Sequence, residues 1–367
     1  MSAPSTLNGL LDAHLAAHPE RTAFIDGERR PSYAQFDALA EQGARWFEAQ
    51  GMVAGDRVAV WLVNRIEWLS LLFGAARVFG AARVGVTVVA ANTRYRYAKV
   101  EYILAKSHAK MLVLQLNFRK IDFPAELAGV SPEAVPSLQK IAVIDHDERT
   151  PATVLNRSTV ACDLASYGGE RSRRAGESAD APLILFTTSG TTKAPKLVVH
   201  PQRTISRHSS RVADAYGFTA PGAVMLAALP FCGVFGLNGA LAAFAGVAPV
   251  VLIDTFDGAE GARLIRQHEV THTFGSDEMY RRLADAVSDQ QPFPSARVFG
   301  FAAFQPGMSI FAEKMAERGL PLIGLYGSSE VQALFALQRP DAPFGQRIEG
   351  GAGIPLLAKR RRYAFAT

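Results

Sequence analysis

Cysteine is scarce in this sequence. The 367 residues include only Cys162 and Cys232, which lie far apart and lack the paired spacing of a metal-binding motif. We therefore predict neither a disulfide framework nor a cysteine metal site, and we expect a reducing, cytoplasmic location. The N-terminus also lacks a charged start followed by an apolar block, so no secretory signal is predicted.

The sequence has little excess charge of either sign outside its last residues. Lysine and arginine number 39 against 34 aspartate and glutamate, a net charge of +5, but four of the positive charges form the run "KRRR" at residues 359–362. The remainder carries 35 basic and 34 acidic side chains. We therefore expect no nucleic-acid partner, and we interpret the basic run as a solvated tail rather than a targeting signal.

Charged residues are missing altogether from residues 216–253. Pro221, Pro230 and Pro249 interrupt this stretch, and the glycine-rich window between the last two barely reaches the length that spans a bilayer. We predict that the stretch forms a buried strand, helix and strand, and that the chain has no integral membrane segment.

The sequence does contain a regular alternation of apolar strand patterns and helical patterns. The first helix is expected over residues 32–50, where "SYAQ" offers a serine cap with a glutamine three residues later. The next segments are predicted as strands at 57–62, 82–89, 111–115 and 140–145, and as helices at 66–80 and 97–108.

The alternation stops between residues 145 and 182 and then resumes. The interruption is polar, aperiodic and rich in glycine, serine and arginine, so we interpret its later part as a linker. Beyond it the pattern predicts strands at 183–188, 224–229, 249–254, 271–274, 297–301 and 322–327, and helices at 204–216, 261–269, 277–288 and 309–319.

This alternation predicts an α/β fold with two tandem doubly wound, mostly parallel sheets and helices on both faces. We expect a first α/β subdomain with its linker over residues 1–178 and a second over residues 179–348. Residues 349–367 are expected to be the truncated start of a strand-rich subdomain followed by the basic tail.

A loop rich in hydroxyl groups, "TTSGTTKAPK", follows the apolar strand "LILF". It lies at the carboxyl end of the strand, where open α/β sheets bind their ligands. Gly190 permits close approach of the backbone, and Lys193 and Lys196 can neutralise charge, so the loop predicts a polyphosphate site. A polar surface turn is the alternative interpretation. The common P-loop, which needs G-x-x-x-x-G-K-[ST] and a helix directly afterwards, is not matched.

A second motif, "GLYGSSE" at residues 324–330, also ends an apolar strand. The aromatic face of Tyr326 suits a purine, and the carboxylate of Glu330 beside phosphates suits Mg²⁺. A tight turn with a capping serine is the alternative interpretation here.

Together these motifs resemble those of the adenylate-forming superfamily, which includes acyl-CoA synthetases, luciferases and nonribosomal adenylation domains. "TTSGTTKAPKLVVH" resembles its phosphate loop, and "YGSSE" its Tyr-Gly-x-Thr/Ser-Glu motif. "LPFCGVFGLNG" stands where the family has its acyl-pocket motif, and "GVTVVAANTRYRYAKVEYIL" resembles the early region of acyl-CoA synthetases. The order and spacing of the motifs match along nearly the whole chain.

The resemblance implies that a carboxylic acid reacts with ATP and Mg²⁺ to give an acyl-adenylate, and that CoA then takes the acyl group as a thioester. The partners would be these small molecules, with both the ATP site and the acyl site in the second subdomain. The residues that would contact the ATP phosphates are Thr188, Ser189, Gly190, Thr191, Thr192, Lys193 and Lys196.

The same resemblance assigns the other site residues. Tyr326 would stack on adenine beside Gly327 and Ser328, Ser329 would touch the α-phosphate, and Glu330 would bind the metal. Thr188, Lys196 and Glu330 would form the catalytic group. The opposite adenine face would be formed by Ala302 and Ala303, and the acyl pocket by Phe231, Cys232, Phe235 and Gly236.

The sequence departs from the family pattern in several places. Lys193 and Leu197 stand where the phosphate loop usually has glycines, and Cys232 replaces a histidine often found in the acyl-pocket motif. The family's ribose-binding aspartate, hinge and C-terminal domain with a catalytic lysine have no match after "EGGAGIP". We therefore expect an ATP- and acyl-binding core of impaired or absent activity, with a non-catalytic binding module or inactive remnant as the alternative. Because residues 229–246 contain no lysine or arginine, we expect an aliphatic or aromatic monocarboxylate.

Overall fold

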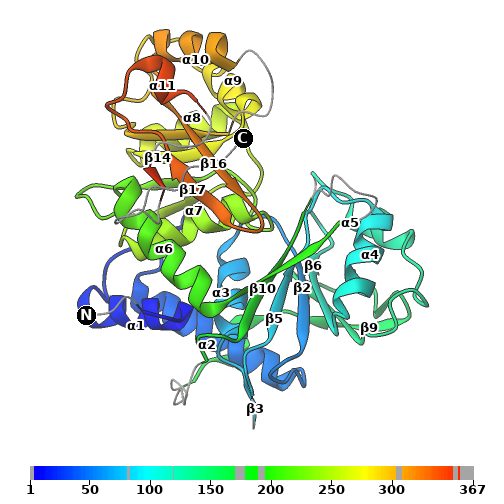
Figure 1. Ribbon diagram of the computed structural model, residues 1–367. Coiled ribbons are helices and arrows are strands. Elements are labelled where there is room, and N and C mark those ends of the chain that lie inside the picture. The colour runs from blue at the N-terminus through cyan, green and yellow to red at the C-terminus, as the bar shows by residue number, and fades with distance from the viewer. Residues whose placement is uncertain are drawn as a thin grey trace, which may run out of the picture. The chain divides into compact units, whose positions relative to one another are not determined.

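The computed structural model describes residues 4–80, 83–118, 120–169, 178–188, 195–302, 308–349 and 354–355 (Figure 1). It contains two compact units. Unit 1 comprises Met1–Arg207 and Pro230–Gly233, and unit 2 comprises His208–Leu229 and Val234–Thr367.

Unit 1 is built around a sheet with the strand order β11-β10-β5-β2-β6-β7-β9-β8. The strands from β10 to β9 are parallel, and β11 and β8 are antiparallel edge strands. The bounds are β2 Arg57–Trp61, β5 Thr87–Ala90, β6 Met111–Gln115, β7 Lys140–Ile144, β8 Thr153–Val154, β9 Arg157–Ala161, β10 Pro182–Thr187 and β11 Leu197–Pro201.

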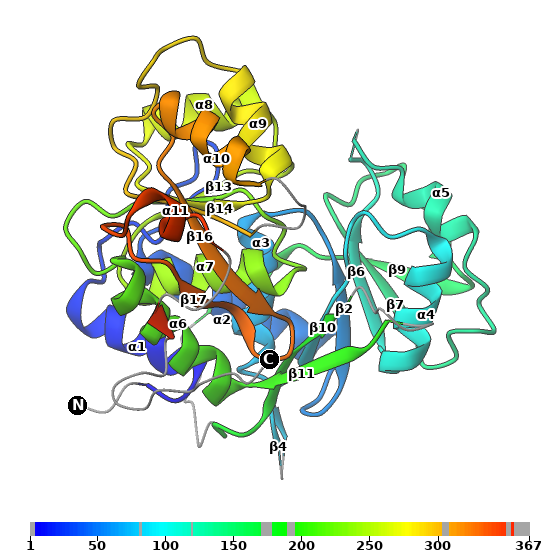
Figure 2. The same cartoon turned by 45° about the horizontal axis from the view of Figure 1, so that its top comes forward.

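Helices cover both faces of this sheet (Figure 2). Helices α4 (Tyr97–Ser107) and α5 (Phe123–Ala128) pack with alternate residues of the central strands into one apolar core. Helices α2 (Tyr33–Ala49) and α3 (Ile66–Ala75) pack against each other on the opposite face. The remaining elements of unit 1 are α1 Leu7–Ala17, β1 Phe24–Ile25, β3 Phe79–Gly80, β4 Arg83–Val84 and the 3₁₀ helix Leu164–Tyr167.

Unit 2 contains a second sheet in which the strands follow the order β13-β12-β14-β15-β16-β17-β18. The pairs from β13 to β16 are parallel, whereas β16, β17 and β18 are antiparallel. The bounds are β12 Met225–Ala227, β13 Val250–Leu252, β14 His272–Gly275, β15 Val298–Phe301, β16 Leu322–Ser328, β17 Gln332–Leu337 and β18 Ile354–Pro355.

The helices of unit 2 alternate with its parallel strands. Helix α6 (Gln202–Tyr216) begins in unit 1 and enters unit 2 at His208. Its other helices are α7 Val234–Ala245, α8 Gly258–Gln267, α9 Asp277–Asp285, α10 Met308–Glu317 and α11 Phe344–Arg347. The α/β fold with two mostly parallel, helix-flanked sheets is therefore confirmed.

The uncharged stretch forms strand β12, helix α7 and strand β13, as expected. Helix α7 is buried over most of its circumference, which explains why it lacks charge. Within the described ranges, no helix combines the length and the apolar character needed to cross a lipid bilayer.

Two features of unit 1 differ from the expectation. The polar interruption contains β8 and β9, and β9 joins the sheet beside β7. Strand β10 pairs in parallel with β5, so it belongs to the first sheet. The boundary between the compact units along the chain falls between Arg207 and His208 rather than after residue 178. The reason for this difference is that β9, which precedes the expected linker, and β10, which follows it, lie in the same sheet. Of the expected linker, residues 170–177 lie outside the described residues, and of residues 350–367 only 354–355 are described.

Candidate functional site

The hydroxyl-rich motif begins at the carboxyl end of a buried strand. Residues 183–186 of β10 are buried, and β10 pairs with β5 on one side and with β11 on the other. The motif therefore connects two antiparallel strands, β10 and β11, rather than a strand and a helix. This connection distinguishes it from the common P-loop, in which a helix follows.

Thr188 and Lys196 close the base of this connection in unit 1. The amide of Thr188 donates to the carbonyl oxygen of Lys196 at 3.0 Å, and the amide of Lys196 donates to Thr188 Oγ1 at 3.3 Å. Thr188 is half-buried and Lys196 is exposed. The structure thus brings these two predicted residues together. Ser189, Gly190, Thr191, Thr192 and Lys193 lie outside the described residues.

The second motif lies in unit 2, at the end of β16 and in the turn before β17. Tyr326 is 52% exposed, as a ring that stacks on a ligand must be. Glu330 lies in the turn, exposed to solvent, directly after the half-buried Ser328 and Ser329. The structure therefore groups the predicted adenine and metal residues on one hairpin.

Two glycines allow the chain to pack closely around this hairpin. A Cβ atom on Gly327 would lie 2.5 Å from Cα of Ala333, and one on Gly324 would lie 2.1 Å from the carbonyl oxygen of Glu349. Both contacts are with backbone, which cannot move aside as a flexible side chain could. Gly327 therefore has a packing role in addition to the predicted role beside the nucleotide.

Contacts from two helices hold β17, the strand that follows the turn. His208 Nε2 of α6 lies 2.7 Å from the carbonyl oxygen of Ala333. The hydroxyl group of Tyr216, also in α6, donates to the carbonyl oxygen of Leu334 at 3.0 Å. On the other side, Asn238 Nδ2 of α7 donates to Gln332 Oε1 at 3.1 Å, and both side chains are buried. Local sequence patterns do not reveal these positioning residues, because the partners lie 94 to 125 positions apart in the chain.

Ala302 directly follows β15, and Phe301 of β15 pairs with Gly324 of β16. Because β15 and β16 are parallel neighbours, Ala302 and Tyr326 lie at the same edge of the sheet. Ala302 is half-buried, while Ala303 lies outside the described residues.

The predicted acyl-pocket residues are divided between the units. Phe231 and Cys232 belong to unit 1, and Phe235 and Gly236 belong to α7 of unit 2. The ring of Phe235 is half-buried, with its centroid 6.1 Å from that of Phe274. Gly236 is buried within α7.

Phe231 is anchored firmly in unit 1. Its amide donates to Asn64 Oδ1 at 2.8 Å, its ring centroid lies 5.8 Å from that of Trp68, and it is only 1% exposed. Cys232 is 3% exposed, and burial raises the pKa of its thiol to about 11, so the thiol is protonated at neutral pH. These two side chains therefore pack as apolar groups in this structure.

Glu330 has the chemistry that a magnesium site requires. Mg²⁺ is commonly held by one or two carboxylates together with substrate phosphates, rather than by a cage of protein ligands. An exposed carboxylate beside two serines fits this pattern. In the described part of the chain, no group of three or more His, Cys, Asp or Glu side chains is arranged to hold a metal.

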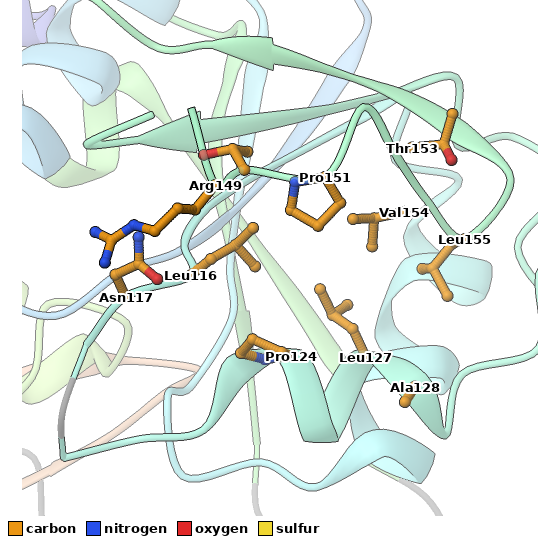
Figure 3. Close-up of a pocket in the computed structure, with 11 residues that line it drawn as sticks. Leu116, Asn117, Pro124, Leu127, Ala128, Arg149, Pro151, Thr153, Val154 and Leu155 are labelled. Carbon is orange, nitrogen blue, oxygen red and sulfur yellow. The ribbon is translucent and has the colours of Figure 1, made fainter. Parts of the chain in front are cut away.

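Two pockets of unit 1 lie away from the motif residues. A pocket of about 460 Å³ lies among the loops that follow β2, β7 and β9 and includes Arg65, Glu67 and Cys162. The other, of about 400 Å³, lies between α5 and the segment around Pro151, with Arg149 and Asn117 on one side and Val154 and Leu155 on another (Figure 3). Of the motif residues that the structure describes, none lines either pocket.

Comparison with known proteins relates the chain to one family. Residues 11–360 match the family described as AMP-binding enzyme. The Bacillus subtilis (strain 168) protein YngI is 26% identical over 370 residues, a match that covers 96% of this chain and 66% of YngI. The indoleacetate–CoA ligase of Aromatoleum aromaticum is 28% identical, with coverage of 95% of this chain and 64% of the ligase. The chain thus spans about two thirds of the length of these relatives.

Solved structures agree on the fold. The o-succinylbenzoate coenzyme A synthetase MenE from Bacillus subtilis, solved in complex with ATP and a magnesium ion, superposes with a TM-score of 0.72 at 22% identity, covering 95% of this chain and 65% of that one. The match to the family extends over nearly all residues from the first helix to the end of unit 2, and includes both motif hairpins. This chain belongs to the family of AMP-binding enzymes, within the adenylate-forming superfamily.

Proposed function

We propose that this chain carries the ATP-binding and acyl-binding core of an acid–thiol ligase. In the first step a carboxylate oxygen attacks the α-phosphorus of ATP, the bond to pyrophosphate breaks, and an acyl-adenylate forms. In the second step the sulfur of CoA attacks the acyl carbonyl carbon, AMP leaves, and the thiol proton is released. Both steps depend mainly on positioning and on charge stabilisation, which is the contribution that the motif residues can make.

The pairing of Thr188 with Lys196 at the end of β10 is the observation that carries this proposal. It places the hydroxyl group of Thr188 and the backbone of Lys196, whose side chain is exposed, at the base of the hydroxyl-rich segment, at the carboxyl edge of the sheet. Thr188 Oγ1 accepts from the amide of Lys196, and in that arrangement its hydroxyl proton can point toward a phosphate oxygen. Lys196 then stabilises the negative charge of the phosphates.

The hairpin of β16 and β17 in unit 2 carries the other residues that the family resemblance assigns to the nucleotide and the metal. The exposed ring of Tyr326 offers a face to adenine, and Ala302 lies at the same edge of the sheet for the opposite face. Ser329 is assigned to the α-phosphate. Glu330 would hold Mg²⁺, which neutralises phosphate charge when bound.

The acid is proposed to be a monocarboxylate with an aliphatic or aromatic body. The support is that residues 229–246 contain no lysine or arginine to pair with a second carboxylate. Phe235 is the predicted pocket residue whose ring is only half-buried, so it is assigned to contact with the acyl body.

The test combines nucleotide binding with turnover. Calorimetry should show MgATP binding that Lys196→Ala weakens by about 1.5–3 kcal/mol, the usual worth of a hydrogen bond to a charged group. The matched control is Lys106→Ala, which removes an exposed lysine of α4 in the same unit and should leave affinity unchanged.

Exchange of pyrophosphate into ATP should depend on an added monocarboxylic acid. Equal affinity of wild type and Lys196→Ala would contradict the assignment of the first motif. Exchange that depends on an added acid would contradict the alternative, a non-catalytic binding module or inactive remnant.

A further inference from the structure

Two tyrosine side chains reach the two ends of the hydroxyl-rich connection in unit 1. The hydroxyl oxygens of Tyr95 and Thr187 lie 2.7 Å apart, so Tyr95 contacts the last residue of β10. Tyr102 donates its hydroxyl proton to the carbonyl oxygen of Pro195 at 3.0 Å, just before Lys196. Both partners lie more than 90 positions away in the sequence.

These contacts flank the pair that closes the connection. Thr187 precedes Thr188, and Pro195 precedes Lys196, so each tyrosine holds the residue next to one member of the pair. Each end of the connection is therefore held twice: by the opposite end and by a phenol.

The tyrosines themselves stand on a rigid support. Val100, Ile103 and Leu104 of α4 are buried in the same core as Leu185 of β10. The segment before α4 is also fixed, because the carbonyl oxygen of Asn92 accepts hydrogen bonds from the amide of Tyr95 at 2.9 Å and from Trp61 Nε1 at 3.0 Å.

Leu197 adds a third anchor at the end of the connection. This position is one of the two at which the sequence departs from the glycines usual in the family. In the structure Leu197 is partly buried against the core of α4, as are Tyr95 and Tyr102. A side chain at this position therefore fixes the start of β11 to the same support.

Burial raises the pKa of the Tyr95 phenol above its ordinary value, although its hydrogen bond with Thr187 acts in the opposite direction. The phenol thus stays protonated at neutral pH and keeps a proton for a hydrogen bond.

We propose that Tyr95 and Tyr102 are positioning residues that clamp both ends of the 188–196 connection, and so hold Thr188 and Lys196 ready for the phosphates of a nucleotide. The inference rests on the proposed function of that connection. Groups held in place before a ligand arrives lose less conformational entropy on binding, and therefore bind it more tightly.

The first measurement needs no nucleotide. Hydrogen exchange followed by mass spectrometry is compared for wild type, Tyr95→Phe and Tyr102→Phe, in peptides that cover residues 185–198. Both variants should exchange faster there, because the amide of Thr188 loses part of its protection, while the melting temperature changes little. Tyr97→Phe is the matched control, since Tyr97 begins the same helix and is 51% exposed. Exchange in Tyr97→Phe should equal that of wild type.

The second measurement is MgATP affinity by calorimetry. Each of the two clamp variants should raise Kd by about 2- to 10-fold, the net worth of one hydrogen bond. A general structural effect and a clamp predict different values of Kd when Tyr95→Phe or Tyr102→Phe is combined with Lys196→Ala. If the tyrosines act through Lys196, the Kd of a double variant rises by less than the product of the two single increases.

Unchanged exchange in both phenylalanine variants would overturn the clamp. Faster exchange with unchanged MgATP affinity would also overturn the proposal, because the clamp would then not serve the nucleotide. If wild type binds no MgATP at all, the proposed function fails, and the exchange measurement still decides whether the tyrosines hold the connection.

Discussion

Glu330 is exposed in the turn between β16 and β17, so its proposed role in metal binding can be tested separately from a role in the stability of the turn. Glu330→Gln keeps the size of the side chain and removes its charge. We expect this variant to lose most of the dependence of nucleotide binding on Mg²⁺, because a neutral amide is a weaker ligand for a hard cation. The melting temperature should stay nearly unchanged. Calorimetric titration of ATP with and without Mg²⁺ measures the first effect, and thermal unfolding the second.

The control for this variant is Glu313→Gln, which removes an exposed carboxylate from α10 in the same unit. It should change neither quantity. A large fall in melting temperature for Glu330→Gln, with the Mg²⁺ dependence intact, would assign Glu330 to the structure of the turn instead.

His272 of β14 is a buried histidine that links stability to pH. Its Nε2 lies 2.9 Å from the carbonyl oxygen of Tyr216, which can only accept, and its Nδ1 lies 2.6 Å from Thr271 Oγ1. Burial lowers the pKa of His272 to about 4, although the hydrogen bond to Tyr216 acts in the opposite direction. The folded state therefore binds this proton more weakly than the unfolded state, in which the pKa is near 6.5.

Stability should consequently fall as the pH drops below about 6.5. From pH 7 to pH 5, the free energy of unfolding should decrease by roughly 2 kcal/mol on account of His272. Urea unfolding at a series of pH values measures this slope, which should flatten in His272→Asn even if that variant is less stable overall. His146→Gln, which removes an exposed histidine, is measured in the same way for comparison. A slope that is the same in wild type and His272→Asn would contradict the argument.

At the scale of elements, sequence patterns predicted those segments whose structure is decided locally or by burial. Helix α2 begins where expected because Ser32 and Gln35 form a capping box, with the amide of Gln35 donating to Ser32 Oγ and the amide of Ser32 to Gln35 Oε1. Strand β9 was missed because its residues are only partly buried, so no apolar pattern marks it. Strand β17 was missed because Gln332 and Leu334 adopt left-handed backbone angles, which no pattern in the sequence predicts.

The candidate site also contains residues that local sequence patterns predict and residues that they do not. Thr188, Lys196, Tyr326 and Glu330 stand in short motifs, and these can be found by inspection of the sequence. The contacts that hold the motifs, such as that of Tyr102 with Pro195, join residues far apart in the chain. Only the paired strands and packed helices bring them together, so the supporting residues could not be predicted from local patterns.

The close contact of α2 with α3 depends on glycine. A Cβ atom on Gly74 would lie 2.7 Å from the amide nitrogen of Ala44 and 2.9 Å from the carbonyl oxygen of Ala40, both backbone atoms of α2. We expect Gly74→Ala to destabilise unit 1 by about 1–3 kcal/mol, because the two helices must move apart. Urea unfolding measures the change. Gly168→Ala is the control, since an added Cβ there meets nothing within 4 Å. Equal stability of both variants would show that α2 and α3 can separate at no cost.

At the scale of the whole molecule, the chain crosses between its compact units more than once. It leaves unit 1 after Arg207, returns for Pro230–Gly233, and leaves again at Val234. Phe231 anchors the returning segment through the hydrogen bond that its amide donates to Asn64 Oδ1 and through the contact of its ring with Trp68. A segment of four residues thus completes a core whose other members come mostly from the first half of the chain.

Phe231→Ala should therefore destabilise the protein by about 3–5 kcal/mol, the usual cost of removing a fully buried phenylalanine ring. Denaturant unfolding tests this value, and Phe231→Leu should recover a large part of the loss because it fills much of the volume. If Phe231→Ala unfolds like wild type and instead raises the KM for the acid, the side chain lines the acyl pocket as the family resemblance implies.

The returning segment also limits how the gene for such a protein can be recombined. A single crossover placed between codons 208 and 229 would join a new second half to a unit 1 that still needs Phe231 and its neighbours from that half. The incoming sequence must therefore carry a compatible Pro230–Gly233 segment, because otherwise a cavity remains in the core of unit 1. Exchange of the second half between relatives should therefore succeed chiefly in two cases. Either the four residues are exchanged together with the unit 1 residues that bury them, such as Asn64 and Trp68, or they already match those residues.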